Sequence, residues 1–112
     1  MNAPLPAHAL LRPEVRLEDA LLARGGTVLL SGTQALVRLP LMQRAADAAR
    51  GLDSAGFVSG YRGSPLGQVD QQVWKAKAAY DAAGVRFLPA INEELAATAV
   101  LGTQRVEADP QR

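Results

Sequence analysis

The spacing of apolar positions changes along the chain and divides it into alternating short and long elements. Short apolar runs bounded by glycine or proline predict buried strands at 27–30, 56–59 and 85–88. Apolar residues three or four positions apart predict helices at 34–49, 68–83 and 93–106. Strands that alternate with helices of this length indicate right-handed βαβ units. We therefore expect an α/β fold, a parallel sheet with flanking helices.

Local signals predict where these helices begin, bend and end. Thr33 is expected to cap the first helix, and Pro40 predicts a kink or restart because it has no N–H and crowds the carbonyl of Leu36. Gly84 is expected to end the second helix, and Asn92 to cap the third. The apolar face of the first helix is predicted to be Ala35, Leu36, Leu39, Met42, Ala46 and Ala49. That of the second is predicted to be Val69, Val73, Ala76 and Tyr80.

Two segments are expected along the chain. Residues 1–26 read as an N-terminal extension with a short helix at 16–23, and residues 27–112 as one domain. Three strands are few, since typical sheets have about 5–6. The domain is therefore expected to be incomplete, either a half of an oligomer or the front piece of a longer protein.

Charge and composition exclude several classes of function. The 112 residues carry 12 basic and 11 acidic side chains, so nothing electrostatic favours nucleic acid or an anionic membrane as a partner. There is no cysteine, which excludes disulfides, cysteine-ligated zinc and an iron–sulfur cluster held by this chain. No apolar run is long enough to span a bilayer, and no targeting segment stands out, so a cytoplasmic location is expected.

The loop 60–67 (GYRGSPLG) is the most informative segment, because ligands of open α/β sheets bind at the carboxyl ends of the strands. Gly60 and Gly63 allow the backbone to approach a ligand closely, Ser64 offers a hydroxyl, and Arg62 can pair with a carboxylate or phosphate. The spacing matches neither a dinucleotide fingerprint nor a P-loop. By itself it leaves a structural turn and a cofactor or anion loop both open.

Glu93 and Glu94 open the third predicted helix and allow two interpretations. Acidic residues in a first turn complement the helix dipole and are usually solvated. Alternatively, one glutamate points into a pocket at the sheet edge, where burial would raise its pKa and let it share a proton with a heterocycle. No cluster of side chains with metal-ligand spacing and no Ser–His–Asp arrangement occurs, so no metal site is expected in this chain.

Three segments together resemble a known family. They are LLSGTQALVRLPLMQR at 29–44, AGFVSGYRGSPLGQVDQQVWKAK at 55–77 and INEELAATAVLGTQ at 91–104. In this order they are similar to the N-terminus of the indolepyruvate ferredoxin oxidoreductase family, especially its long fused bacterial form, over residues 27–107. The wider 2-oxoacid:ferredoxin oxidoreductases have G-N-x-A, Y-P-x-T-P-S and S-E-x-x-A-A at the places of 32–35, 61–65 and 92–93 here.

The resemblance implies a thiamine diphosphate enzyme that oxidatively decarboxylates a 2-oxoacid, reduces ferredoxin through iron–sulfur clusters and releases an acyl-CoA. The matched region would be the N-terminal part of the domain that binds the aminopyrimidine ring. Glu93 would be the catalytic glutamate, which hydrogen-bonds a ring nitrogen and promotes the imino tautomer. Ser64 falls on the position of a family threonine beside the substrate. Ser64 and Arg62 would therefore bind the substrate, and Gly60 and Gly63 would bind the cofactor.

Family members are many times longer than this chain. Their diphosphate-binding domain with its magnesium site, their cluster cysteines and their CoA-handling parts have no counterpart here. We therefore expect the isolated chain neither to bind thiamine diphosphate tightly nor to turn over. The expected partners are the remainder of the enzyme or a partner subunit in a homo-oligomer, with ferredoxin and CoA engaged by the whole.

Two other functions stay open. A stand-alone nucleotide- or anion-binding module would hold phosphate at 60–67 and leave Glu93 solvated. A non-catalytic assembly fragment would bind no ligand and would meet a partner through Trp74 and the incomplete sheet edge.

Overall fold

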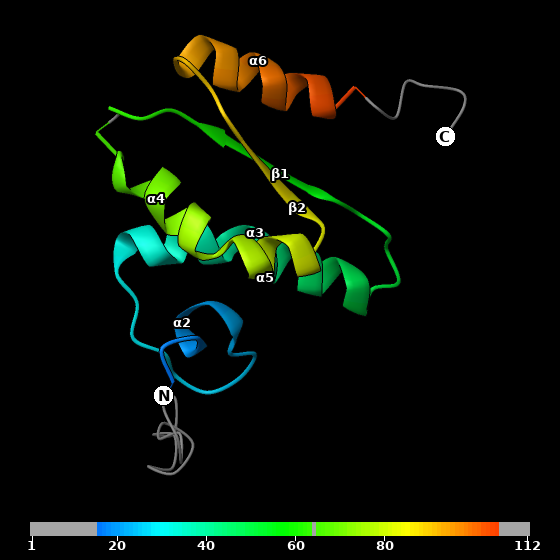
Figure 1. The fold of residues 1–112 in the computed structure, drawn as a ribbon. Coiled ribbons are helices and arrows are strands. Elements are labelled where there is room, and N and C mark those ends of the chain that lie inside the picture. Colours follow the sequence, from blue (N-terminus) through cyan, green and yellow to red (C-terminus); the bar gives the residue numbers. More distant parts are fainter. Residues whose placement is uncertain (1–15, 64, 106–112) are drawn as a thin grey trace, which may run out of the picture.

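The computed structural model describes residues 16–63 and 65–105, and within them the chain is a mixed α/β structure (Figure 1). The elements in chain order are α2 (Asp19–Leu22), α3 (Gly32–Ala49), β1 (Gly56–Gly60), α4 (Gln68–Lys75), α5 (Lys77–Ala82), β2 (Val85–Pro89) and α6 (Glu93–Thr103). Two of the three predicted strands and the predicted alternation of strand and helix are confirmed. The last predicted helix ends at Thr103, and position 106 lies outside the described residues.

The two strands pair in parallel, as predicted, from Gly56 opposite Val85 to Gly60 opposite Pro89. The strands lie close together where they begin: a Cβ added to Gly56 would lie only 2.8 Å from Val85 Cγ2. Helices α3, α4 and α5 cover one face of the sheet, and α6 covers the other (Figure 1). The expectation of a parallel sheet with flanking helices is therefore confirmed for the described residues.

The predicted strand at 27–30 is wrong. These residues form an irregular segment, and Leu29 is 95% exposed. A strand requires a neighbour for its backbone hydrogen bonds, and the sheet of the described residues consists of β1 and β2 alone. A short apolar run cannot show whether such a neighbour exists.

The start of α3 also differs from the prediction. Ser31, not Thr33, is the N-cap: its Oγ accepts from the Gln34 N–H at 3.1 Å, and the Ser31 N–H donates to Gln34 Oε1 at 2.9 Å. This reciprocal capping box satisfies two backbone N–H groups at once, whereas a cap at Thr33 would place Leu36, which has no acceptor, at the reciprocal position. The helix then runs through Pro40 without a restart.

The buried face of α3 differs from the predicted one, of which Met42 alone packs against the core cluster of the described residues. Val37 and Leu41 are the buried side chains, with Leu41 only 3% exposed, whereas Leu39 is 63% exposed and Leu36 is also exposed. Both stripes of this helix are apolar, so the spacing alone does not decide which one faces the sheet.

The helix predicted at 68–83 divides at Ala76 into α4 and α5, yet its predicted face is buried. The break occurs because the backbone of Ala76 leaves the helical region, with φ −90° and ψ 8°. Gly84, with φ +67°, follows the end of α5, as predicted. The Tyr80 hydroxyl donates to the Val37 carbonyl at 2.8 Å within the core. That core consists of Val37, Leu41, Val73, Ala76, Tyr80 and Val85.

Arg38 ties the N-terminal extension to α3. Its guanidinium donates to the carbonyls of Asp19 and Ala20, each at 3.1 Å, and to that of Ala23. The helix in this extension covers only Asp19–Leu22, shorter than the predicted 16–23. Arg38 therefore caps the C-terminal end of α2 from a distance in sequence.

Arg44 makes a similar connection at the other end of α3. Its Nε donates to the Ala83 carbonyl and its Nη1 to Ser54 Oγ, both at 2.8 Å. Ser54 in turn donates to Asp47 Oδ2 at 2.5 Å. The hydrogen bonds from Ser54 and Gln43 lower the pKa of the Asp47 carboxyl. This network fixes the connection that leads into β1.

Candidate functional site

The carboxyl ends of β1 and β2 bring together the two loops that the sequence singles out. Tyr61 directly follows β1, and Glu93 is the first residue of α6, just after β2. The Tyr61 hydroxyl donates a hydrogen bond to Glu93 Oε1. Asn92 is the N-cap of α6, as predicted, and accepts from the Leu95 N–H at 2.9 Å. The cap fixes Glu93 in the first turn, on the side of the β1 loop.

A pocket of about 420 Å³ lies beside this contact. Its polar lining includes the side chains of Tyr61, Asp70 and Glu93. Its walls are mainly apolar and include Val58, Leu66, Val69 and Phe87. Apolar walls with a few convergent polar groups are typical of sites for small organic ligands.

The charge state of Glu93 differs from the expectation for a buried glutamate. Glu93 is exposed, and the hydrogen bond from Tyr61, helped by a backbone hydrogen bond, lowers the pKa of its carboxyl. The same hydrogen bond raises the pKa of the Tyr61 phenol. Of the two interpretations of Glu93 and Glu94, burial with a raised pKa does not hold for Glu93, because its exposed carboxylate accepts a hydrogen bond from Tyr61.

The predicted residues of the loop after β1 differ in how far the structure supports a special role for them. Gly63 has φ +93°, a conformation that favours glycine, so this position supports a tight turn. A Cβ on Gly60 would meet nothing within 4 Å among the described residues, so their packing does not require glycine there. Ser64 lies outside the described residues.

Arg62 and Asp70 form the second polar contact of this region. The Arg62 side chain is 85% exposed, and its Nε lies 3.7 Å from Oδ2 of Asp70, whose side chain is only 11% exposed. Oδ1 of Asp70 is buried and has no hydrogen-bond partner among the described residues. Arg62 thus lies toward a carboxylate of its own chain.

Sequence reasoning missed Tyr61 and Asp70 as members of the site. Tyr61 follows a strand directly, which was a usable signal, but its partner Glu93 is 32 residues away. Asp70 lies in the first turn of α4, where an acidic residue is ordinarily explained by the helix dipole. Its burial became visible only with the tertiary structure.

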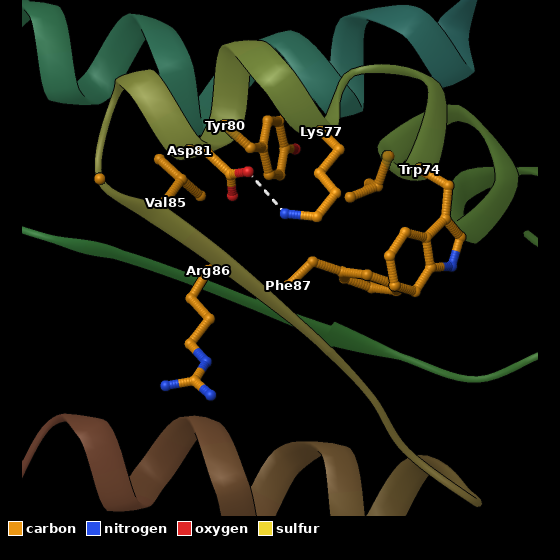
Figure 2. Close-up of a pocket in the computed structure, with 9 residues that line it drawn as sticks. Trp74, Lys77, Tyr80, Asp81, Val85, Arg86 and Phe87 are labelled. Carbon is orange, nitrogen blue, oxygen red and sulfur yellow. Dashed lines mark hydrogen bonds and ion pairs between the residues drawn. The ribbon is translucent and has the colours of Figure 1, made fainter.

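A larger hollow of about 470 Å³ lies between α4, α5 and the first half of β2 (Figure 2). Trp74 packs edge-on against Phe87 at 5.8 Å between ring centroids, at the boundary between α4 and the sheet. Lys77 pairs with Asp81 at 2.5 Å, while Arg86 extends from β2 away from these helices. In this hollow, Lys77 and Asp81 pair with each other, and both lie away from the carboxyl ends of the strands. We therefore regard the pocket at Glu93, and not this hollow, as the candidate site.

Comparison with known proteins adds no assignment. No family model matches the chain, and neither the curated proteins nor the solved structures include a match. Among the residues that the structure describes, no group of three or more His, Cys, Asp or Glu side chains could hold a metal ion. No helix in the same residues is long and apolar enough to cross a membrane.

Proposed function

We propose that this chain is the N-terminal part of a thiamine diphosphate-dependent 2-oxoacid ferredoxin oxidoreductase, with an aryl pyruvate such as indolepyruvate as substrate. The observation that carries the proposal is the meeting of Glu93 with the loop after β1 at the carboxyl edge of two adjacent parallel strands, beside a largely apolar pocket. The motifs that resemble the family are those that supply these residues. The pocket would take the pyrimidine end of the cofactor.

The residues of the pocket fit an aminopyrimidine ring. A flat heterocycle needs apolar walls for its faces, and Val58, Val69 and Phe87 line the pocket. Its ring nitrogen needs a group that stabilises the protonated form, and a carboxylate whose pKa is lowered remains charged for that purpose. Glu93 would therefore accept a hydrogen bond from the protonated ring nitrogen.

Tyr61 would act through Glu93. Its hydroxyl holds one carboxylate oxygen and favours the ionised form. When bound, thiamine diphosphate supplies a nucleophilic carbon that adds to the carbonyl of the 2-oxoacid and holds the electrons left by decarboxylation. The diphosphate, its magnesium ion, the iron–sulfur clusters and CoA would be bound by other parts of the enzyme or by a partner subunit.

The test uses the protein that carries this chain at its N-terminus together with the sequence encoded downstream. Indolepyruvate- and CoA-dependent reduction of ferredoxin or a viologen dye is measured for wild type, Glu93→Gln and Glu94→Gln. We expect Glu93→Gln to abolish turnover without unfolding the protein, and Glu94→Gln, one position along the same helix turn, to retain it. Near-normal activity of Glu93→Gln would refute the proposal.

An anion-binding module is the second candidate, favoured by the exposure of both Glu93 and Arg62. It predicts that inorganic phosphate or a nucleotide shifts the backbone amide signals of 60–63 in an NMR titration of the 112-residue chain. Shifts of this kind that disappear in Arg62→Gln and persist in Glu93→Gln would replace the oxidoreductase proposal with this one.

A further inference from the structure

Helix α6 lies alone on its side of the sheet, while α3, α4 and α5 lie on the other side (Figure 1). Its inner face consists of partly buried residues spaced three and four positions apart: Ala96, Ala99 and Thr103. A second line of residues at the same kind of spacing is exposed throughout: Glu94, Thr98, Leu101 and Arg105. We call this second line the outer face of α6.

The middle of the outer face carries no charge. No acidic or basic residue stands between Glu94 and Arg105 in the sequence. Three apolar side chains of the helix are at least 38% exposed: Leu95, Val100 and Leu101. The Thr98 hydroxyl donates to the Glu94 carbonyl at 2.8 Å, so burial would not leave its hydrogen without an acceptor. A surface helix normally turns charged residues outward, so this apolar stretch indicates a face that another protein surface covers.

The two ends of the outer face carry opposite charges. Glu94 lies in the first turn of α6, and Arg105 follows the last turn, where Gln104 keeps helical backbone angles. Along a helix axis these two residues are separated by about 16 Å, or three turns. Both side chains are exposed, and neither has a hydrogen-bond or ion-pair partner in the part of the chain that the structure describes.

We infer that the outer face of α6 is an interface with a second copy of this chain, in which the two α6 helices lie antiparallel. A two-fold axis through the middle of the face brings Glu94 opposite the partner's Arg105, and Arg105 opposite the partner's Glu94. The apolar stretches, with Leu101 of each copy, then cover each other. A parallel pair would instead set like charges side by side, so the charges select the antiparallel arrangement. This inference goes beyond the proposed function and does not depend on it.

A second copy fits this pattern because the face supplies both of the charges that its own reversed copy needs. The contact is small, since two helices of this length bury less than about 1,200 Å², in the range of weak and transient complexes. We therefore expect a dissociation constant on the order of 0.1–1 mM. Added salt should weaken the dimer further, because exposed ion pairs are screened.

Sedimentation equilibrium of the 112-residue chain, from micromolar to millimolar concentration at low ionic strength, measures the dimer. Glu94→Arg and Arg105→Glu should each weaken dimerisation by about fivefold or more, since each variant sets two like-charged pairs against each other across the axis. Asp81→Arg makes the same change of charge as Glu94→Arg, but on α5 at the other side of the sheet, and should dimerise like wild type.

Circular dichroism melting curves verify that each variant is folded. If a charge reversal unfolds the chain, Glu94→Gln and Arg105→Gln serve in its place. Each neutral variant removes two ion pairs from the dimer without adding a repulsion, so each should weaken dimerisation by about twofold or more.

Mixing the two reversed variants gives the sharpest test. Glu94→Arg has two positive ends on its outer face and Arg105→Glu has two negative ends, so each repels itself and complements the other. An equimolar mixture should therefore form heterodimers at least as tightly as wild type forms its dimer. The double variant Glu94→Arg/Arg105→Glu should dimerise like wild type, and the amide signals that shift when wild type is diluted should fall within 94–105.

Several outcomes would overturn the inference. A wild-type chain that stays monomeric at millimolar concentration shows that something other than a second copy covers this face. A dimer that both reversals leave unchanged, or folded variants that fail to associate when mixed, would exclude the antiparallel pairing. Dilution shifts at 74–77 in place of 94–105 would move the interface to the hollow beside Trp74. The pocket at Glu93 and its proposed function are unaffected in each of these cases.

Discussion

Two tyrosines mark two regions that differ in what their hydrogen bonds do. Tyr80 is 2% exposed in the core beneath α3, and its hydroxyl donates to the backbone carbonyl of Val37. Tyr61 lies at the sheet edge, and its hydroxyl donates to the side chain of Glu93. The pKa of both phenols is raised, by burial to about 12 for Tyr80 and chiefly by the hydrogen bond to Glu93 for Tyr61.

The two hydrogen bonds should therefore be detected by different measurements, of stability for Tyr80 and of a carboxyl pKa for Tyr61. The partner of Tyr80 is a main-chain group that cannot titrate, so the value of that contact is expressed in the stability of the fold. The partner of Tyr61 is a carboxylate that lines a pocket, so the contact is expressed in the pKa of Glu93. The core residue supports the structure, and the edge residue favours the ionised form of Glu93.

Of the substitutions considered, Tyr80→Ala should lower the free energy of unfolding the most. Removing a large buried aromatic side chain costs about 3–5 kcal/mol in the free energy of unfolding. Urea denaturation followed by circular dichroism should show loss of most or all of the folded state. Tyr61→Ala, at the edge, should shift the same curve by much less.

Tyr80→Phe separates the ring from the hydroxyl and keeps the comparison measurable if the alanine variant does not fold. It should lower the free energy of unfolding by about 1 kcal/mol, the net value of one hydrogen bond. A Tyr80→Ala protein as stable as wild type would show that the core is not centred on this ring.

Gly56→Ala should have the second largest effect on stability. Gly56 begins β1, the strand whose other end leads into the candidate site. The new Cβ would lie 2.8 Å from Val85 Cγ2, and overpacking of this kind costs about 1–3 kcal/mol. Gly60→Ala is the matched control on the same strand, since its Cβ would meet none of the described residues within 4 Å. Thermal unfolding should separate the two variants; equal midpoints would contradict the close strand contact.

Tyr61→Phe should have the smallest effect on stability and a direct effect on the site. The folded-state pKa of Glu93 is lowered by Tyr61, so this carboxylate contributes stability that is present above its unfolded pKa and lost as pH falls through the folded pKa. Without the hydroxyl, the pKa of Glu93 should rise toward its ordinary value. A carbon-13 NMR titration of the Glu93 carboxyl measures this directly, with Tyr80→Phe as a control that should leave it unchanged.

Signals confined to a few neighbouring residues predicted much of this fold. Asn92 and Gly84 mark the ends of helices through their own backbone or side-chain chemistry, and both are confirmed. The segment 27–30 and the faces of α3 could not be predicted in this way. An apolar run becomes a strand only when another strand pairs with it, and an apolar stripe is buried only where a neighbour covers it.

The site shows the same division. The general rule for parallel sheets correctly placed the loop at 60–63 and Glu93 at one edge. It could not predict that Glu93 would be exposed beside a phenol, or that an oxygen of Asp70 would be buried with no hydrogen-bond partner in the part of the chain that the structure describes. Those facts depend on which side chains meet across long stretches of sequence. The roles assigned to Glu93, Gly60, Gly63, Ser64 and Arg62 stay predictions.

The attachment of α2 has a consequence for how freely this protein can change. Arg38 holds the extension through the carbonyls of Asp19, Ala20 and Ala23, and every amino acid carries a carbonyl. The anchor therefore does not read the side chains of α2. Substitutions at exposed positions of α2 should leave these three hydrogen bonds intact, whereas a substitution of Arg38 removes all of them at once; Leu21, which packs against the core, and the buried Ala23 hold the extension through their side chains. The hydrogen-bonded part of the attachment therefore tolerates changes in the sequence of α2, while its packed part does not.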